Sequence, residues 1–227
     1  MNIIKVLNEA FPFLLKGFGI TMQTTFIALI IAIFLGLLSC LAHLSCIKIF
    51  SFLSDVYVWI IRGTPLIVQV FYIYFAIPQL IQHFGINFRI SVFTASIITL
   101  GLNAGAYISE IFRGGVLAVD VGQTEAARSL GFSKWRSLIR VVLPQAIRIS
   151  IPSLVNQFII SLKDTSIVSV ISLGEIIYEA KIYIGRTMES FSTWTVVAIF
   201  YLIIVTILTQ ISMVAERNYN RVNKSQC

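Results

Sequence analysis

Long runs of apolar residues alternate with short polar segments along this chain of 227 residues. The first run is the clearest, because residues 17–47 contain no Asp, Glu, Lys or Arg. A helix needs about 20 apolar residues to cross the hydrocarbon core of a bilayer. The pattern therefore predicts five transmembrane helices, at about residues 20–41, 56–81, 90–111, 147–171 and 192–215.

The segments between these runs complete the expected organisation. Residues 1–16 mix apolar side chains with Glu9 and Pro12, and we expect them to lie at a membrane interface. A polar loop that includes Glu175 and Lys181 is predicted between the fourth and fifth helices. No internal repeat or soluble domain stands out, so the prediction is one all-α transmembrane domain, 1–227.

Composition agrees with a membrane protein and narrows its partners. Hydrophobic residues make up 57% of the chain and charged residues 12%, whereas a soluble domain carries roughly 25% charged residues. The net charge is +7, but the basic residues lie in short loops between apolar runs. This placement is typical of membrane topology, so we do not expect nucleic-acid binding.

The distribution of Lys and Arg predicts the orientation, because cytoplasmic loops carry an excess of both. Ten of these residues fall on one side of the five helices and five on the other, with Arg62 and Lys163 inside helices. The C-terminus and the charged segment 120–144 are therefore predicted to be cytoplasmic. The N-terminus is predicted to lie outside.

The second predicted helix is interrupted by Arg62-Gly63-Thr64-Pro65. Pro65 lacks a backbone donor and disfavours helical geometry at Thr64. Backbone groups freed in this way are tolerated at membrane depth beside protein or a water-filled cavity. The break could therefore contact a solute through Thr64 and the backbone of Leu66, or it could be a structural proline kink.

Polar residues in the fourth helix share one face. Gln157, Ser161 and Asp164 are spaced four and three residues apart, and residues at this spacing are neighbours on a helix. They could bind a solute, with Asp164 meeting a cationic group, or they could hold helices together. Ionisable residues at membrane depth are costly and usually functional, which favours a binding role.

The third helix places Asn103, Tyr107 and Glu110 on one face. Asn103 and Tyr107 could line a path or hold helices together through hydrogen bonds. Glu110 lies three residues before Arg113 near the cytoplasmic end, where a helix-end salt bridge is expected.

Residues 120–144 have the pattern of two short amphipathic helices. Asp120 is predicted to cap the first, with Gln123 completing a weak capping box. Gly131 suits a left-handed C-cap and Ser133 suits the next N-cap. Such short helices are marginal alone, so this segment either lies on lipid headgroups or binds a partner.

Chemistry of its own is not expected in this chain. It has no Gly-Lys dipeptide and therefore no phosphate-binding loop of the G-x-x-x-x-G-K-[ST] type. Its sequence shows no nucleophile–base pair and no metal-binding spacing of Cys or His. We expect no bound metal, no cofactor and no hydrolysis of ATP by this polypeptide.

The segment reads Glu125-Ala126-Ala127, three residues, Gly131, nine residues, then Val141-Val142-Leu143-Pro144. This resembles the EAA motif of bacterial ABC importer permeases, E-A-A-x₃-G-x₉-I-x-L-P. Val141 replaces Ile, which is a conservative departure. Nearly the whole chain is similar to the polar amino acid uptake branch of these permeases. The matching positions are Gly17, Thr21, the stretches 62–66 and 103–110, and the stretch 162–166.

The resemblance implies a type I ABC importer permease fold in the bacterial inner membrane. Its cytoplasmic loop, 112–146, would carry coupling helices that dock on a separate ATPase subunit, which binds ATP and Mg²⁺. A second permease chain, identical or related, and an extracytoplasmic amino acid-binding protein would complete the importer. The residues implied in coupling are Glu125, Ala126, Ala127, Gly131, Leu143 and Pro144.

The resemblance also implies the solute. The predicted solute-binding residues are Thr64, Leu66, Asn103, Gln157, Ser161 and Asp164. In relatives that handle cationic amino acids an acidic residue is expected where Gln157 stands, so a glutamine- or cystine-like solute is favoured over arginine or lysine. An alternative from another class is an ion-coupled secondary transporter that uses Lys163 and Asp164.

Overall fold

The computed structural model describes residues 3–45 and 47–224, with side chains described for 6–45 and 47–213. The first two and last three residues of the predicted domain lie outside this range. Every regular element in the described part is a helix. The elements are α1 (Ile3–His43), α2 (Lys48–Gly63), α3 (Leu66–Phe71), the π-helix η1 (Tyr72–Ala76), α4 (Ile77–His83), α5 (Val92–Leu117), α6 (Val121–Ser129), α7 (Lys134–Ser137), the π-helix η2 (Leu138–Val142), α8 (Leu143–Asp164), the 3₁₀ helix η3 (Thr165–Ile171), α9 (Ile176–Thr187) and α10 (Ser190–Lys224).

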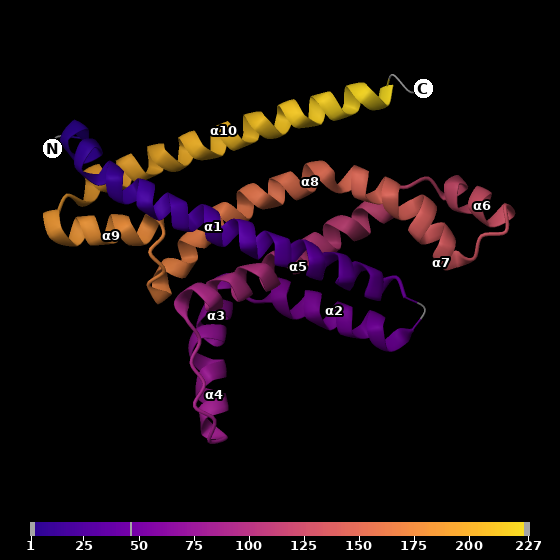
Figure 1. The fold of residues 1–227 in the computed structure, drawn as a ribbon, viewed down its shortest axis with the longest axis horizontal. Coiled ribbons are helices and arrows are strands. Elements are labelled where there is room, and N and C mark those ends of the chain that lie inside the picture. The colour runs from indigo at the N-terminus through magenta and orange to yellow at the C-terminus, as the bar shows by residue number, and fades with distance from the viewer. Residues whose placement is uncertain (1–2, 46, 225–227) are drawn as a thin grey trace.

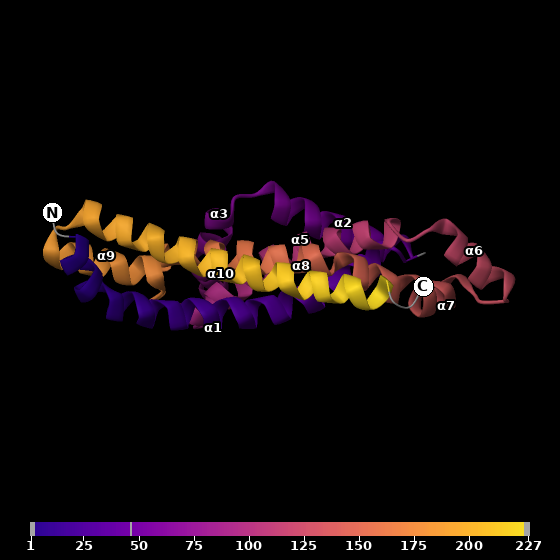
Figure 2. The ribbon, with the colours of Figure 1, turned by 90° about the horizontal axis from the view of Figure 1, so that it is seen from above.

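Five helical stretches of the described chain are long and apolar enough to cross a membrane, which confirms the predicted fold class and number of spans. They are Val6–His43, Leu66–His83, Val92–Leu117, Lys134–Ile171 and Ser190–Met213. The long helices α1, α5, α8 and α10 run along a common direction, with α6 and α7 at one end and α9 at the other (Figure 1 and Figure 2).

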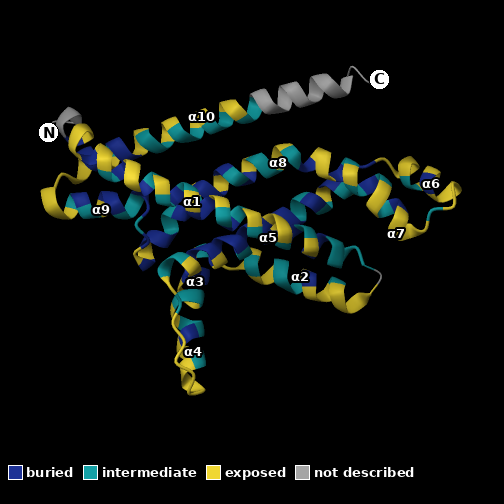
Figure 3. Ribbon diagram, viewed as in Figure 1, coloured by how far each residue is buried: buried dark blue, intermediate teal, exposed yellow. Residues whose placement is uncertain are grey.

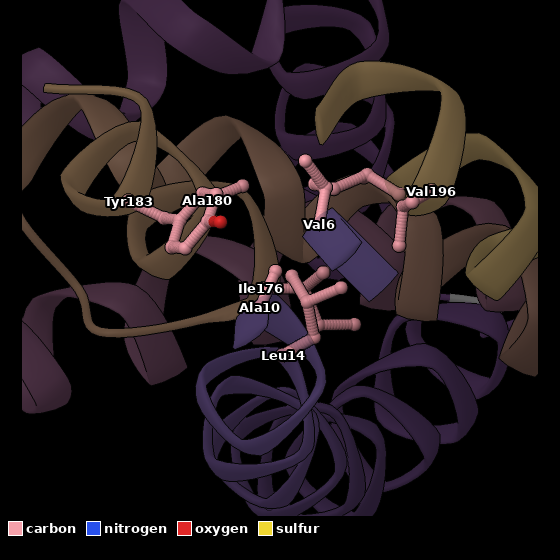
Figure 4. Packing of buried hydrophobic residues seen from close by; sticks show 8 residues of the cluster. Val6, Ala10, Leu14, Ile176, Ala180, Tyr183 and Val196 are labelled. Atoms are coloured by element: carbon pink, nitrogen blue, oxygen red, sulfur yellow. The ribbon is translucent and has the colours of Figure 1, made fainter. Parts of the chain in front are cut away.

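The first helix starts earlier than expected. Residues 1–16 were predicted to form an interfacial segment, but helix α1 begins at Ile3 and continues unbroken to His43. Val6, Ala10 and Leu14 are spaced four residues apart and are all buried. They pack against α9 and α10 in one apolar cluster (Figure 4). The prediction missed this face because Glu9 and Pro12 interrupt the apolar residues of this segment.

The predicted polar loop after the fourth span is also wrong, because it contains helix α9. Ile176, Ala180 and Tyr183 lie on one face of α9 and are buried in the same cluster as Leu14. Glu175 begins the helix as its N-cap and accepts hydrogen bonds from the backbone N–H groups of the first turn. The charged residues of this segment led to the prediction of a loop, although its apolar residues follow the spacing of an amphipathic helix.

Helix α5 forms the centre of the bundle and is the most buried of the five spans (Figure 3). Hydroxyl groups connect it to its neighbours: Ser109 Oγ donates to Ser39 Oγ of α1 at 3.0 Å, and Ser39 Oγ lies 2.8 Å from Ser54 Oγ of α2. Hydrogen bonds of this kind join transmembrane helices that lack a hydrophobic driving force for association.

The second predicted helix, 56–81, is divided at the predicted break. Helix α2 ends at Gly63, and Thr64 and Pro65 are extended. The chain then turns away from the long direction of the bundle, so that α3, η1 and α4 project sideways as an arm (Figure 1). Residues at this turn face α5 and α8, where the candidate site lies.

Candidate solute cavity and coupling segment

A cavity of about 370 Å³ lies where the break after α2 meets α5 and α8. Its lining residues are Thr64, Pro65, Leu66, Asn103, Tyr107, Gln157, Ile160, Asp164 and Ile167. Five of the six predicted solute-binding residues are therefore brought together. The sixth, Ser161, is buried on the same face of α8 but does not line the cavity.

The break itself is held by Gln69, which sequence reasoning missed. Gln69 Nε2 donates to the carbonyl of Ile61 at 2.8 Å and to the carbonyl of Thr64 at 3.1 Å, and lies 3.0 Å from Thr64 Oγ1. The Thr64 hydroxyl donates to the carbonyl of Ile60 at 2.8 Å. One buried amide thus satisfies carbonyls that the end of α2 leaves without helical partners.

Asn103 joins the break to α5. Its Nδ2 donates to Gln69 Oε1 at 3.0 Å, so Asn103 both lines the cavity and holds two elements together. Tyr107 lines the cavity one turn further along α5. The guanidinium of Arg62 lies over the Tyr107 ring, 5.4 Å from its centroid, a distance that permits a cation–π interaction.

The wall from α8 carries the charge of the cavity. Asp164 is the charged residue among those that line it, and Gln157 supplies an amide. Gln157 Nε2 points back toward Ser161 Oγ at 3.5 Å, which places Ser161 behind Gln157. Lys163 is exposed and does not line the cavity, because adjacent residues of a helix point in different directions.

The expected salt bridge at the end of the third span is present. Arg113 donates to Glu110 through Nε at 3.0 Å and through NH2 at 2.7 Å. A second arginine joins it, since Arg62 NH1 lies 3.4 Å from Glu110 Oε2. Two guanidinium groups therefore share one carboxylate beside Tyr107.

At the opposite end of the bundle, Glu175 is fully buried. Its carboxylate accepts backbone N–H groups of Ile177 at 2.9 Å and Tyr178 at 2.7 Å. Burial raises the pKa of this carboxyl to about 7, which the two hydrogen bonds only partly oppose. Gly17 of α1 packs here, because a Cβ at Gly17 would lie 2.8 Å from the Glu175 carbonyl carbon.

The candidate coupling segment, residues 120–144, contains the two predicted helices, α6 and α7. Asp120 Oδ1 accepts the backbone N–H of Gly122 at 2.7 Å, and Ser133 Oγ accepts that of Arg136 at 3.4 Å. Gly131 has a φ of +83°, which confirms the predicted left-handed C-cap. The predicted capping box is not formed, because Gln123 Oε1 faces Gln145 Nε2 at 3.5 Å instead.

The residues of the EAA-like pattern divide between surface and interior. Glu125, Ala126 and Gly131 are exposed, whereas Ala127 is buried. Leu143 is half-buried, and Pro144 lies in the first turn of α8, where its missing N–H is tolerated. Consequently α7, η2 and α8 follow one another without a break from the coupling segment into the fourth span.

Comparison with known proteins identifies the family. Residues 37–220 match the family described as the binding-protein-dependent transport system inner membrane component. The chain belongs to this family. It is therefore the permease subunit of an ABC importer and not the ATPase subunit.

Relatives place the chain within the amino acid branch of these permeases. It is 39% identical over 208 residues to the glutamine transport system permease protein GlnP of Escherichia coli (strain K12), which covers 92% of this chain and 93% of that protein. It is 36% identical over 206 residues to the arginine transport system permease protein ArtQ of Bacillus subtilis (strain 168), with 91% and 92% covered.

A solved structure agrees with this assignment of the permease. The crystal structure of an amino acid ABC transporter with histidines superimposes with a TM-score of 0.87 at 34% identity, covering 96% of this chain and 99% of that one. The type I importer fold is thus shown. These relatives give no support to the ion-coupled alternative.

Proposed function

We propose that this permease forms the translocation path for a polar amino acid with an uncharged side chain, such as glutamine or cystine. The observation that carries the proposal is the charge of the cavity, whose lining residues include one carboxylate, Asp164, beside the amides of Asn103 and Gln157. One carboxylate matches the α-ammonium that every amino acid carries. A cationic side chain would need a second acidic group, which Gln157 does not provide.

The proposed roles follow from the contacts around the cavity. Asp164 pairs with the α-ammonium, and Gln157, Asn103 and Thr64 offer hydrogen bonds to polar groups of the solute. The backbone at Leu66 borders the same space, and Ser161 positions Gln157. One relative is named for glutamine transport and another for arginine transport, so similarity alone does not select the solute. The proposal of an uncharged side chain is supported instead by the single carboxylate among the residues that line the cavity.

We propose further that α6 and α7 dock on a separate ATPase, which binds ATP and Mg²⁺. Exposed Leu130 and Val121 stand beside basic side chains in this segment, which suits an apolar socket with acidic borders. The charge asymmetry of the loops supports a cytoplasmic C-terminus in the inner membrane. An extracytoplasmic binding protein delivers the solute, and a second permease chain completes the path.

Reconstitution tests the solute assignment. Proteoliposomes with the ATPase, the binding protein and internal ATP should take up glutamine or cystine, whereas an ion gradient alone should drive no uptake. Asp164→Asn should lower uptake while ATPase docking persists, and Gln157→Glu should shift preference toward arginine. Lys163→Gln is the matched control, because Lys163 does not line the cavity. Normal uptake by Asp164→Asn, or a wild-type preference for arginine, would contradict the proposal.

A second experiment tests coupling. Gly131→Pro removes the left-handed turn between α6 and α7, and Glu125→Lys reverses an exposed charge on α6. Both variants should insert into the membrane normally but lose ATP-dependent uptake and co-purification with the ATPase. Undiminished docking and uptake in both variants would show that this segment is not the coupling surface.

A further inference from the structure

An arginine that does not line the cavity lies against one of the side chains that do. Arg62 lies in the last turn of α2, two residues before Thr64. Its guanidinium covers the ring of Tyr107, 5.4 Å from the centroid, and Tyr107 lines the cavity. Arg62 is therefore one side chain removed from the space that Asp164 faces.

The positive charge of Arg62 is weakly compensated. Its contact to Glu110 is 3.4 Å, longer than the 2.7–2.9 Å of a strong charge-assisted hydrogen bond. The same carboxylate is already held by Arg113 at 2.7 and 3.0 Å. The carboxylate on the same helix as Arg62, that of Asp55, is two turns away, and its Oδ1 lies 2.6 Å from His43 Nδ1. A cation at membrane depth normally has an anionic partner. Arg62 shares its partner, Glu110, with Arg113, so a second anion could bind to Arg62.

Two neutral side chains that line the cavity already donate a hydrogen bond within the protein. The hydroxyl of Thr64 donates to a backbone carbonyl, and the amide of Asn103 donates to Gln69. Within the described part of the chain, the residues that line the cavity include no cation. If the ammonium group of a zwitterionic solute pairs with Asp164, the nearby positive charge that could pair with its carboxylate is that of Arg62.

We propose that Arg62 binds the α-carboxylate of the transported amino acid while Asp164 binds the α-ammonium, an inference that rests on the proposed function. Glu110 keeps its paired contact with Arg113 when Arg62 moves to the solute, so the exchange does not leave the Glu110 carboxylate unpaired. The two charges then recognise the part that all α-amino acids share. The side chain of the solute is left to Gln157.

The test compares an amino acid with its α-amide, which lacks the carboxylate charge. The permease–ATPase complex, purified in detergent without binding protein, is first titrated with L-glutamine, L-cystine and L-arginine in a thermal-shift assay. The best-binding amino acid is then compared with its α-amide. The wild type should prefer the free acid by about tenfold to hundredfold, as expected for hydrogen bonds between charged groups.

Variants of Arg62 distinguish direct binding of the solute carboxylate from a purely structural role of this side chain. Arg62→Gln should bring the ratio of acid to amide affinity close to one, and Arg62→Lys should restore part of the preference. Lys163→Gln is the matched control and should keep the preference, because it removes an exposed cation that does not line the cavity and leaves the contacts of Arg62, Glu110 and Arg113 in place. The ratio is read within each variant, so a general loss of stability does not imitate the effect.

Two results would overturn the assignment of Arg62. One is a wild type that binds acid and amide equally, and the other is an Arg62→Gln variant that weakens both without changing their ratio. If the wild type binds none of the three amino acids, the proposed function fails and this assignment fails with it. Binding with an unchanged ratio therefore rejects Arg62 alone.

Discussion

Replacing Gln69 by leucine tests whether the break after α2 is held by a single side chain. Leucine has a similar volume but neither donates nor accepts a hydrogen bond. The substitution removes the donor shared by the carbonyls of Ile61 and Thr64, and it removes the acceptor of Asn103. Because these bonds connect α2, α3 and α5, we expect both stability and cavity shape to suffer.

The size of the effect follows from the contacts. Hydrogen bonds between transmembrane helices average about 0.6 kcal/mol each, so two donated bonds and one accepted bond predict a loss of about 2 kcal/mol. The loss rises toward about 4 kcal/mol if the carbonyl of Ile61 and the amide of Asn103 find no new partner. Thr64 borders the cavity, where water can replace a lost donor, so the lower value is expected.

Thermal denaturation in detergent and solute titration measure the two consequences. Gln82→Leu is the matched control, because Gln82 also donates to a backbone carbonyl, that of Phe88 at 2.9 Å, but at an exposed site. Gln69→Leu should be about 2 kcal/mol less stable than this control and should bind the solute more weakly. Equal stability and equal affinity in the two variants would refute the role assigned to Gln69.

Two further predictions concern the contact between α1 and α9. Gly17→Ala should destabilise the protein by about 1–3 kcal/mol, because the new Cβ would meet the Glu175 backbone. Gly19→Ala, which meets nothing within 4 Å, should not be destabilising, and equal effects in a denaturation assay would refute the close contact. The raised pKa of Glu175 means that the folded state binds a proton more tightly than the unfolded state, so this group's contribution to stability falls as pH rises from about 4.5 to about 7. Glu175→Gln should remove this fall, worth about 3 kcal/mol, and a stability difference from wild type that is constant from pH 4.5 to 7 would contradict it.

Much of the fold was predictable because membrane burial leaves a strong pattern. Runs of apolar residues indicate the spans, since the bilayer fixes their length. The turn at Gly131 could be predicted because a left-handed backbone favours glycine, and φ at Gly131 is +83°. Gln157 and Asp164 could be grouped because helical spacing places them on one face, and both line the cavity.

Other features depend on tertiary contacts that no local pattern encodes. Pro65 signals a break but not the direction in which the chain continues, which is fixed by Gln69 and its bond to Asn103. Gln69 is a single amide in an apolar stretch, and its role emerges only when α2 ends beside it. The burial of Glu175 could not be predicted either, because a charged side chain is expected to be exposed. It is buried where α1 packs against the start of α9.

The unbroken course of residues 134–164 has a mechanical consequence. At 1.5 Å per residue this rod is about 45 Å long. Near its middle it touches α5 closely, since a Cβ at Gly115 would lie 2.7 Å from the carbonyl oxygen of Ala146. The contact divides the rod unequally, about 18 Å from its start at residue 134 and about 27 Å from its end at residue 164. A rigid rotation about this contact would displace Trp135 and Asp164 in opposite directions, and Asp164 would travel about 1.6 times as far because its arm is longer.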